Sequence, residues 1–260
     1  MIPKNGRKLQ KETDTSLRAR LKHTIRTYSP VTWLVFLIAS LVVFLAWMPS
    51  QMRVIIWDAL VARGIISSML LAFSLLAVSL VWSIGQRMDD WAFLFFNLRG
   101  KRPIWLDRSM LVFTQIGSGI FAMVVGLVLF LTGNRLIAYE LMLGTITLWI
   151  VVELIKALVR RPRPFIRVTQ ARTVGHQARG RSFPSGHTSQ IFFMATLMAK
   201  YFHFSAWIVF LLYALALVVG ITRMYVGAHY PRDVLAGAIL GSAWGLLGVL
   251  VNEYNLNGTG

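Results

Sequence analysis

Long apolar segments alternate with short polar joints along most of the chain. The segments cover approximately residues 31–48, 64–85, 111–132, 137–155, 188–203, 206–222 and 233–251. Each is close to the roughly 20 residues that an α-helix needs to cross a bilayer. The sequence lacks the strand-period alternation of a barrel. The pattern therefore predicts an all-α, polytopic transmembrane helical bundle of six or seven spans.

The segments outside these spans are polar or amphipathic. Residues 1–27 are basic and are expected to form a tail at the membrane surface. Residues 86–110 mix aromatic and charged side chains, which suits a helix lying in the membrane interface. The joints at 133–136 and 204–205 are so short that they predict antiparallel hairpins. The chain divides into this tail and one transmembrane domain, residues 28–255.

Composition adds a strong positive charge to the membrane pattern. The 260 residues are 56% hydrophobic and 14% charged, with 27 Lys and Arg against 10 Asp and Glu. Soluble domains are about 25% charged. In so apolar a chain the excess of cations indicates membrane lipids or a phosphorylated substrate as partners, and argues against nucleic acid. The sequence has no cysteine, which excludes a thiolate nucleophile and a disulfide framework.

Many of the cations lie in one polar loop, residues 156–187, which contains no acid. Loops of this length are usually functional or disordered. Lys156 and Arg163, together with Arg223 at a later helix end, can surround a phosphate with charge-assisted hydrogen bonds. Glu153 is expected to orient Lys156 through an ion pair. The remaining loop arginines are interpreted as anchors at helix ends: Arg160, Arg161, Arg167, Arg172, Arg179 and Arg181.

A tight turn, Ser185-Gly186-His187, directly precedes an apolar helix. Backbone N–H groups at the N-terminus of a helix attract anions, and glycine allows a ligand to approach the backbone closely. Taken alone, Ser185 is more simply a helix cap than a catalytic group. His187 would stand beside a phosphate bound at this turn.

His229 and Asp233 are four residues apart at the start of the last span. On a helix this spacing places both side chains on one face. A carboxylate bonded to one imidazole nitrogen leaves the other nitrogen basic and aimed, as nucleophilic catalysis requires. A single pair of this kind is a weak signal, and a structural pair is its default interpretation.

The three stretches together resemble the type 2 phosphatidic acid phosphatase family, the PAP2 or lipid phosphate phosphatase group. The family pattern is Lys, six residues, Arg-Pro; then Pro-Ser-Gly-His; then Ser-Arg, five residues, His, three residues, Asp. This chain carries it from Lys156 to Asp233, about a third of the sequence. One position departs, because Thr222 stands where serine is usual, and the change keeps a hydroxyl.

The resemblance implies roles for eight residues. His229 would attack phosphorus to give a phosphohistidine, Asp233 would orient His229, and His187 would protonate the leaving oxygen and then activate water. Resembling enzymes need no metal, and no cofactor is expected here. The phosphoryl oxygens would be held by five residues: Lys156, Arg163, Ser185, Gly186 and Arg223.

The implied function is a metal-independent membrane lipid phosphatase. With the site at one membrane face, a lipid could stay in the bilayer and present only its phosphate. Expected substrates are undecaprenyl pyrophosphate, phosphatidylglycerophosphate, phosphatidic acid and lipid A phosphate. Two alternatives are a lipid phosphotransferase on the same site and a non-catalytic membrane protein that binds anionic lipids.

The side of the membrane is a point on which two arguments disagree. In a seven-span arrangement most Lys and Arg share a side with the motif loops, and the positive-inside rule would then favour a cytoplasmic site. Related enzymes mostly face outward, which a six-span chain with an internal N-terminus would allow. The expectation adopted is the cytoplasmic (inner) membrane, with an extracytoplasmic site.

Overall fold

The computed structural model of the chain describes residues 39–40, 42–43, 46–80, 83–98 and 102–257. The expected tail, 1–27, and most of the expected span 31–48 lie outside the described residues. The chain forms two compact units, of which the first ends at Ala62 with helix α3 (Ser50–Ala62), and the second begins at Arg63. The three sequence motifs all lie in the second unit.

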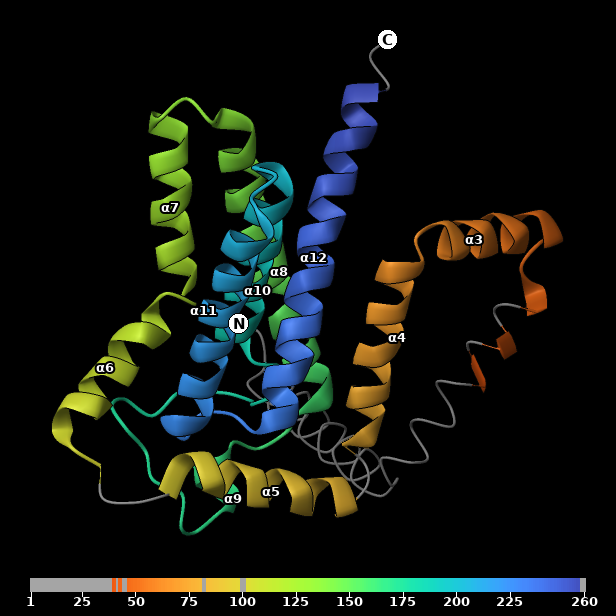
Figure 1. Ribbon diagram of the computed structural model, residues 1–260. Coiled ribbons are helices and arrows are strands. Elements are labelled where there is room, and N and C mark those ends of the chain that lie inside the picture. The colour runs from red at the N-terminus through yellow and green to blue at the C-terminus, as the bar shows by residue number, and fades with distance from the viewer. Residues whose placement is uncertain (1–38, 41, 44–45, 81–82, 99–101, 258–260) are drawn as a thin grey trace, which may run out of the picture. The chain divides into compact units, whose positions relative to one another are not determined.

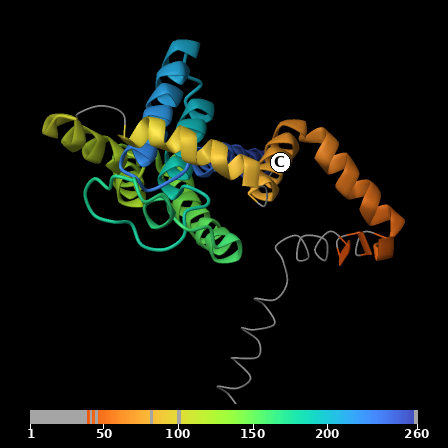
Figure 2. The same cartoon turned by 90° about the horizontal axis from the view of Figure 1, so that it is seen from below.

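The described part of the second unit consists of helices and their connections. In Figure 1 helices α4, α8, α10, α11 and α12 stand side by side, and α5 crosses beneath them; Figure 2 shows the same crossing from below. The helices of this unit are α4 (Gly64–Ser79), α5 (Ser83–Leu98), α6 (Ile104–Gln115), α7 (Gly119–Leu131), α8 (Arg135–Val159), α9 (Pro164–Arg167), α10 (Gly186–Tyr201), α11 (Ala206–Tyr225) and α12 (Pro231–Asn257).

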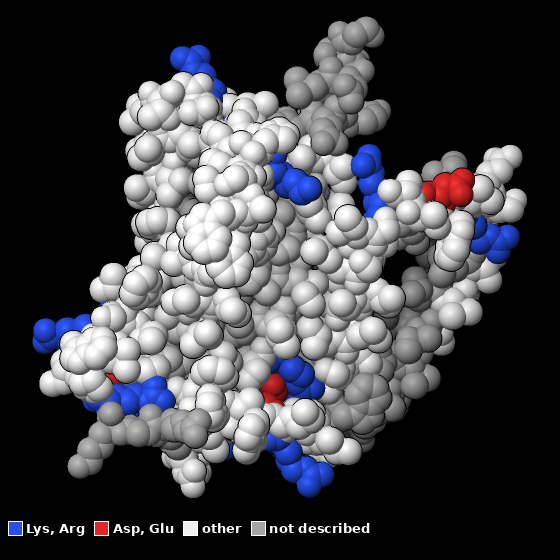
Figure 3. Space-filling view, viewed as in Figure 1, with Lys and Arg blue, Asp and Glu red and all other residues white. Residues whose placement is uncertain are grey.

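The outer surface of the bundle is apolar, as a membrane protein requires. Leu143 and Trp149 on α8 are each 63% exposed, where a soluble protein would present polar side chains. On the face shown in Figure 3, charged side chains of the bundle gather toward its ends and leave an uncharged band between them. The predicted all-α membrane bundle is confirmed.

The candidate spans are fewer than the apolar segments of the sequence. Among the described residues, three helical segments are long and apolar enough to cross a membrane individually: Arg135–Arg167, Ala206–Tyr225 and Pro231–Leu250. Counting each of two bent helix pairs as one span raises the number to five. Helix α10, expected to be a span over 188–203, has 16 residues. The total of six or seven spans stays a prediction.

Two expected spans are wrong in their continuity. The helix expected over 64–85 ends at Ser79, and α4 and α5 meet at an angle of 97°. The span expected over 111–132 is divided into α6 and α7, which meet at 56°. Ser118 begins α7 as its N-cap, and its hydroxyl accepts a hydrogen bond from the amide of Phe121 at 3.1 Å.

The break between α6 and α7 brings the chain against the start of α10. A Cβ added to Gly117 would lie 2.6 Å from the carbonyl oxygen of His187, so only glycine allows this approach. The predicted interface helix over 86–110 is likewise two helices, α5 and the first part of α6. Both corrections place helix ends beside the sequence motifs.

Helices α10 and α12 are packed backbone against backbone along a stripe of glycines. An added Cβ at Gly237 would lie 2.7 Å from the carbonyl oxygen of Ser185, and one at Gly241 would lie 2.1 Å from that of Ser189. Small residues at such spacing allow close helix contact in membranes. The contact fixes the start of α12 against the start of α10, where two of the motifs lie.

Replacing Gly241 by alanine is expected to destabilise the protein. One methyl group at this position would collide with the backbone of α10, and overpacking typically costs about 1–3 kcal/mol. The thermal midpoint in detergent should therefore fall by several degrees. Gly248→Ala is the matched control on the same helix, because its added Cβ meets Leu197 at an ordinary 3.8 Å. Equal midpoints for the two variants would contradict the packing argument.

Candidate active site

All eight residues predicted from the motifs lie at one end of the upright helices, on five elements or their junctions. Lys156 is in the last turn of α8 and Arg163 directly precedes α9. The other six positions follow the same pattern, at or beside helix termini: Ser185, Gly186 and His187 at the start of α10, Arg223 in the last turn of α11, and His229 and Asp233 around the start of α12.

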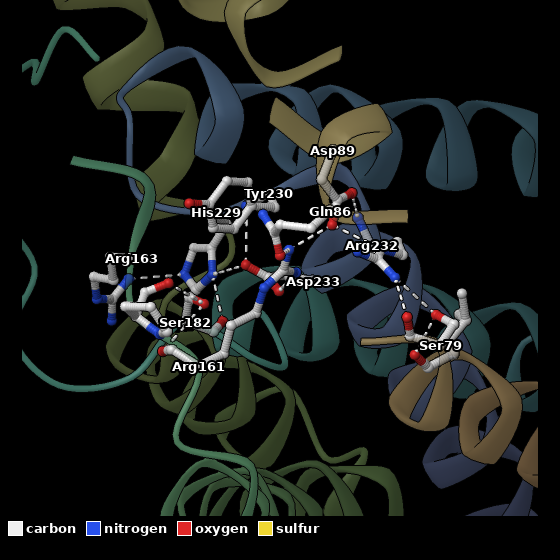
Figure 4. A network of polar contacts seen from close by, with 12 residues as sticks. Ser79, Gln86, Asp89, Arg161, Arg163, Ser182, His229, Tyr230, Arg232 and Asp233 are labelled. Atoms are coloured by element: carbon white, nitrogen blue, oxygen red, sulfur yellow. Dashed lines mark hydrogen bonds and ion pairs between the residues drawn. The ribbon is translucent and has the colours of Figure 1, made fainter. Parts of the chain in front are cut away.

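His229 is held in a single tautomer by the backbone. It is 2% exposed, and its Nδ1 lies 2.7 Å from the carbonyl oxygen of Ser182. Because a carbonyl oxygen only accepts hydrogen bonds, Nδ1 carries the proton and Nε2 keeps a lone pair. Nη1 of Arg163 lies 3.2 Å from Nε2 (Figure 4). The basic nitrogen thus faces a guanidinium group.

The surroundings of His229 favour a neutral imidazole. Burial lowers the pKa of His229 well below its ordinary value, and the charges of Arg163, Arg223 and Lys156 lower it further. The carbonyl of Ser182 acts in the opposite direction and raises the pKa. A neutral imidazole with an unprotonated Nε2 is the form in which histidine acts as a nucleophile.

The expected hydrogen bond between His229 and Asp233 is absent, and its absence corrects the sequence-based interpretation. His229 precedes α12, which begins at Pro231, so the two residues do not occupy one helix face. Oδ2 of Asp233 is 3.7 Å from Nδ1 of His229 and accepts a hydrogen bond from the amide of Tyr230 at 2.9 Å. Asp233 therefore lies beside the imidazole without a hydrogen bond to it, and the hydrogen bond to the carbonyl of Ser182 orients the ring.

Arg163 and Arg223 present guanidinium groups that the protein satisfies only in part. Arg163 donates to the carbonyls of Ala228 at 3.0 Å and Arg179 at 2.9 Å, and Arg223 donates to the hydroxyl of Thr114 at 2.6 Å. Both are buried, and the Nε of each lacks a hydrogen-bond partner among the described residues. Such donors are suited to an anion.

The turn before α10 and the end of α8 lie together. The Nζ of Lys156 is 3.9 Å from the position of an added Cβ on Gly186. Lys156 also forms the expected ion pair with Glu153, at 2.7 Å. Ser185 occupies the N-cap position of α10, yet its hydroxyl contacts that of Thr188 at 2.9 Å and caps no backbone amide. Its own amide donates to the carbonyl of Asp233, which joins α10 to α12.

Arg161, interpreted from the sequence as a helix-end anchor, is instead buried beside the motif residues. It is 6% exposed, and its guanidinium binds Asp233 at 2.6 Å and Asp89 of α5 at 2.5 Å (Figure 4). It also lies over the ring of Tyr230, 4.1 Å from the centroid. The anchor interpretation is wrong for this residue. Its carboxylate partners, Asp89 and Asp233, are each 72 positions away in sequence, so no local spacing reveals them.

Arg172 is a second loop cation whose interpretation as a simple anchor is wrong. It forms an ion pair with Asp107 of α6 at 2.5 Å, and its backbone amide donates to Asn97 of α5 at 2.7 Å. Asn97 also donates to the carbonyls of Arg172 and Tyr225. These contacts fasten the loop after α9 to α5, α6 and α11.

The family model described as the PAP2 superfamily matches residues 136–256. A bacitracin transport permease protein BcrC of Bacillus licheniformis is 30% identical over 154 residues, which are 58% of this chain and 73% of the relative. The chain belongs to the PAP2 superfamily. An undecaprenyl-diphosphatase of Sulfolobus acidocaldarius is 26% identical over 187 residues, 71% of this chain and 90% of the relative.

A solved structure agrees with this membership. The transmembrane PAP2-type phosphatidylglycerolphosphate phosphatase of Bacillus subtilis aligns with a TM-score of 0.61 and 25% identity, over 72% of this chain and 96% of that one. This PAP2 protein is thus a multi-pass membrane hydrolase of the lipid phosphatase type. Within the described ranges, its His, Asp and Glu side chains form no group of three or more that could hold a metal ion.

Proposed function

We propose that this PAP2 protein hydrolyses a lipid phosphate or pyrophosphate through a phosphohistidine formed on His229. The observation that carries the proposal is the unprotonated Nε2 of His229, buried beside Arg163 with its Nδ1 proton donated to Ser182. A nucleophile oriented in this way needs an electrophile that Arg163 and Arg223 would attract, and phosphate meets that requirement.

In the first step, Nε2 of His229 attacks phosphorus and the bond from phosphorus to the leaving oxygen breaks. Lys156, Arg163 and Arg223, with the Ser185 hydroxyl and the Gly186 amide, would hold the phosphoryl oxygens and stabilise the charge of the transition state. The imidazole ring becomes positively charged in the phosphohistidine. The carboxylate of Asp233, 3.7 Å from Nδ1, would stabilise that charge.

His187 would supply the proton for the leaving oxygen. Burial, followed by the charge of Arg223, lowers the pKa of His187, which lies just before the expected span 188–203. An arriving phosphate dianion would have the opposite effect and favour the protonated imidazole. In the second step, neutral His187 would take a proton from water, the hydroxide oxygen would bond to phosphorus, and the bond to Nε2 would break.

The position of the site suits a substrate that remains in the bilayer. The proposed phosphate ligands lie at the ends of apolar helices, so a head group can reach them while its chains stay among lipids. Undecaprenyl pyrophosphate is the substrate we favour, and phosphatidylglycerophosphate and phosphatidic acid are the alternatives. The relatives named above support the first two. We propose residues 28–255 as the phosphatase domain.

The decisive experiment is phosphate release from these three lipids by purified protein in detergent. Release is expected in the presence of EDTA, because the proposed steps use only protein side chains, and vanadate is expected to inhibit it. A loss of activity in EDTA that Mg²⁺ restores would contradict the metal-independent mechanism. Binding of all three lipids without release would instead support a non-catalytic lipid-binding protein.

A lipid phosphotransferase would use the same phosphohistidine and pass the phosphoryl group to a lipid hydroxyl. Substrate labelled in the transferred phosphate distinguishes the two outcomes, because hydrolysis yields labelled inorganic phosphate and transfer yields a labelled lipid.

For the location of the site we propose the extracytoplasmic face of the cytoplasmic membrane. A reporter fused at residue 175, compared with reporters at both termini, tests that orientation.

A further inference from the structure

A buried network of charges joins α5 to the proposed catalytic residues. The guanidinium of Arg161 donates one hydrogen bond to Asp233 and two others to Asp89 and Gln86, at 2.5 Å and 2.8 Å. Asp89 also binds Arg232 at 2.7 Å, and Arg232 donates to the carbonyl oxygen of Ser79 at the end of α4 (Figure 4).

The network is almost entirely excluded from solvent. Asp233 is fully buried, Asp89 is 3% exposed and Arg161 is 6% exposed. Two carboxylates face two guanidinium groups, so the formal charges cancel. Removing one member would leave a buried charge without its partner, and each charge therefore depends on the others for its position.

The geometry connects this network to the imidazole. One oxygen of Asp233 is bound by Arg161 and the other by the amide of Tyr230, and these two contacts set the 3.7 Å separation from Nδ1 of His229. Arg161 in turn is held on its other side by Asp89. Asp89 and Gln86 lie outside residues 136–256, the part of the chain that the family model covers.

We propose that Asp89 is a positioning residue that acts on the reaction through Arg161 and Asp233. This inference rests on the proposed roles of His229 and Asp233. With Asp89 present, the guanidinium of Arg161 is shared between two carboxylates. With a neutral residue there, Arg161 would pair with Asp233 alone, draw it away from the imidazole and offset its charge. The phosphohistidine would then form more slowly, while the phosphate ligands stay in place.

The test compares Asp89→Asn with the wild-type protein in steady-state and rapid-quench assays. The expected result is a fall in kcat of about 10- to 100-fold, with KM within about twofold, because small displacements of reacting groups cost rate rather than ground-state binding. Formation of the phosphoenzyme should slow by the same factor as kcat. Arg161→Lys keeps the positive charge but loses the forked geometry of the guanidinium, so its kcat should lie between those of wild type and Asp89→Asn.

Asp107→Asn is the matched control, since it breaks the Asp107–Arg172 ion pair, which does not involve Asp233. It should leave kcat within about twofold of wild type. A folded Asp89→Asn variant with wild-type kcat, or one impaired in KM alone, would overturn the inference. If Asp89→Asn does not fold, Gln86→Ala is measured instead, and the same changes in kcat and KM are expected. This variant removes one hydrogen bond to Arg161 without removing a charge.

The failure of this inference is distinguishable from the failure of the proposed function. His229→Gln is assayed in the same experiment. If His229→Gln retains activity, the proposed phosphohistidine mechanism is wrong. If His229→Gln is inactive while Asp89→Asn is fully active, the mechanism stands and only the positioning role of Asp89 is overturned.

Discussion

Replacement of His229 by glutamine should reduce phosphate release at least about a thousandfold, because the nucleophile of a covalent mechanism has no substitute. Glutamine keeps a polar side chain of similar reach, so the packing beside Ser182 and Arg163 should be preserved. The measurement is kcat on the preferred lipid, together with acid-quench detection of a phosphoenzyme. The labelled phosphoenzyme should be absent from the variant.

His176→Gln is the control for this prediction, since His176 is an exposed histidine in the polar loop between α9 and α10. It should retain near wild-type activity and form the phosphoenzyme. Phosphoenzyme in His229→Gln would show that another residue is the nucleophile. The thermal midpoint in detergent establishes that each variant is folded.

Replacement of Arg223 by glutamine should lower kcat by about 100- to 1000-fold, the usual effect of removing one preorganised donor to a developing charge. The same change should leave stability unchanged or raise it. Arg223 is 7% exposed, and none of the described carboxylates pairs with it. A buried charge without a counter-charge costs folding free energy, and glutamine can still donate to Thr114.

Vanadate separates these two effects of the Arg223 substitution. A ligand that binds the folded protein raises the thermal midpoint, and wild type should show a larger rise than Arg223→Gln. Arg223→Lys should recover part of the activity because it keeps the charge. A variant that loses stability together with activity would indicate that Arg223 serves the fold rather than the phosphate.

The sequence predicted the all-α membrane bundle because an apolar run is a local signal, although the expected spans 64–85 and 111–132 are broken in the structure. An apolar stretch of 18 or more residues predicts a membrane helix whatever its neighbours are. The motif residues are short stretches with fixed internal spacing, and the structure brings all of them to one end of the bundle. Their roles in the reaction stay predictions until the variants are measured.

The hydrogen bond expected between His229 and Asp233 is absent because the spacing rule assumes that both residues lie in one helix, and their side chains are instead 3.7 Å apart. Pro231 occupies the first helical position, where its missing N–H costs little, so α12 begins after His229. The break inside 111–132 had a visible signal, the Gly117-Ser118 pair. Hydropathy averaged over an apolar run conceals such a pair. The need for glycine at 117 comes from the backbone of His187, which is distant in sequence.

Arg161 and Asp89 could not be assigned from the sequence for a different reason. Their contact joins residues 72 positions apart, on elements whose packing the sequence pattern does not specify. In the sequence, Arg161 is one of several loop arginines and Asp89 is one acid in an interface helix. Only their burial distinguishes the two residues from the other charged residues of these segments, and they are buried because α5 crosses beneath the upright helices.

The bond from His229 to the carbonyl of Ser182 has a consequence for mutational scanning. The acceptor belongs to the main chain, so every amino acid placed at position 182 supplies the same oxygen as long as the backbone keeps its path. An alanine substitution there would remove only the buried hydroxyl, which donates to the carbonyl of Pro162 at 3.1 Å, and would leave the main-chain contact with His229 in place. The effect of a substitution at residue 182 would therefore be a poor measure of how much the reaction depends on the hydrogen bond between His229 and the main-chain oxygen.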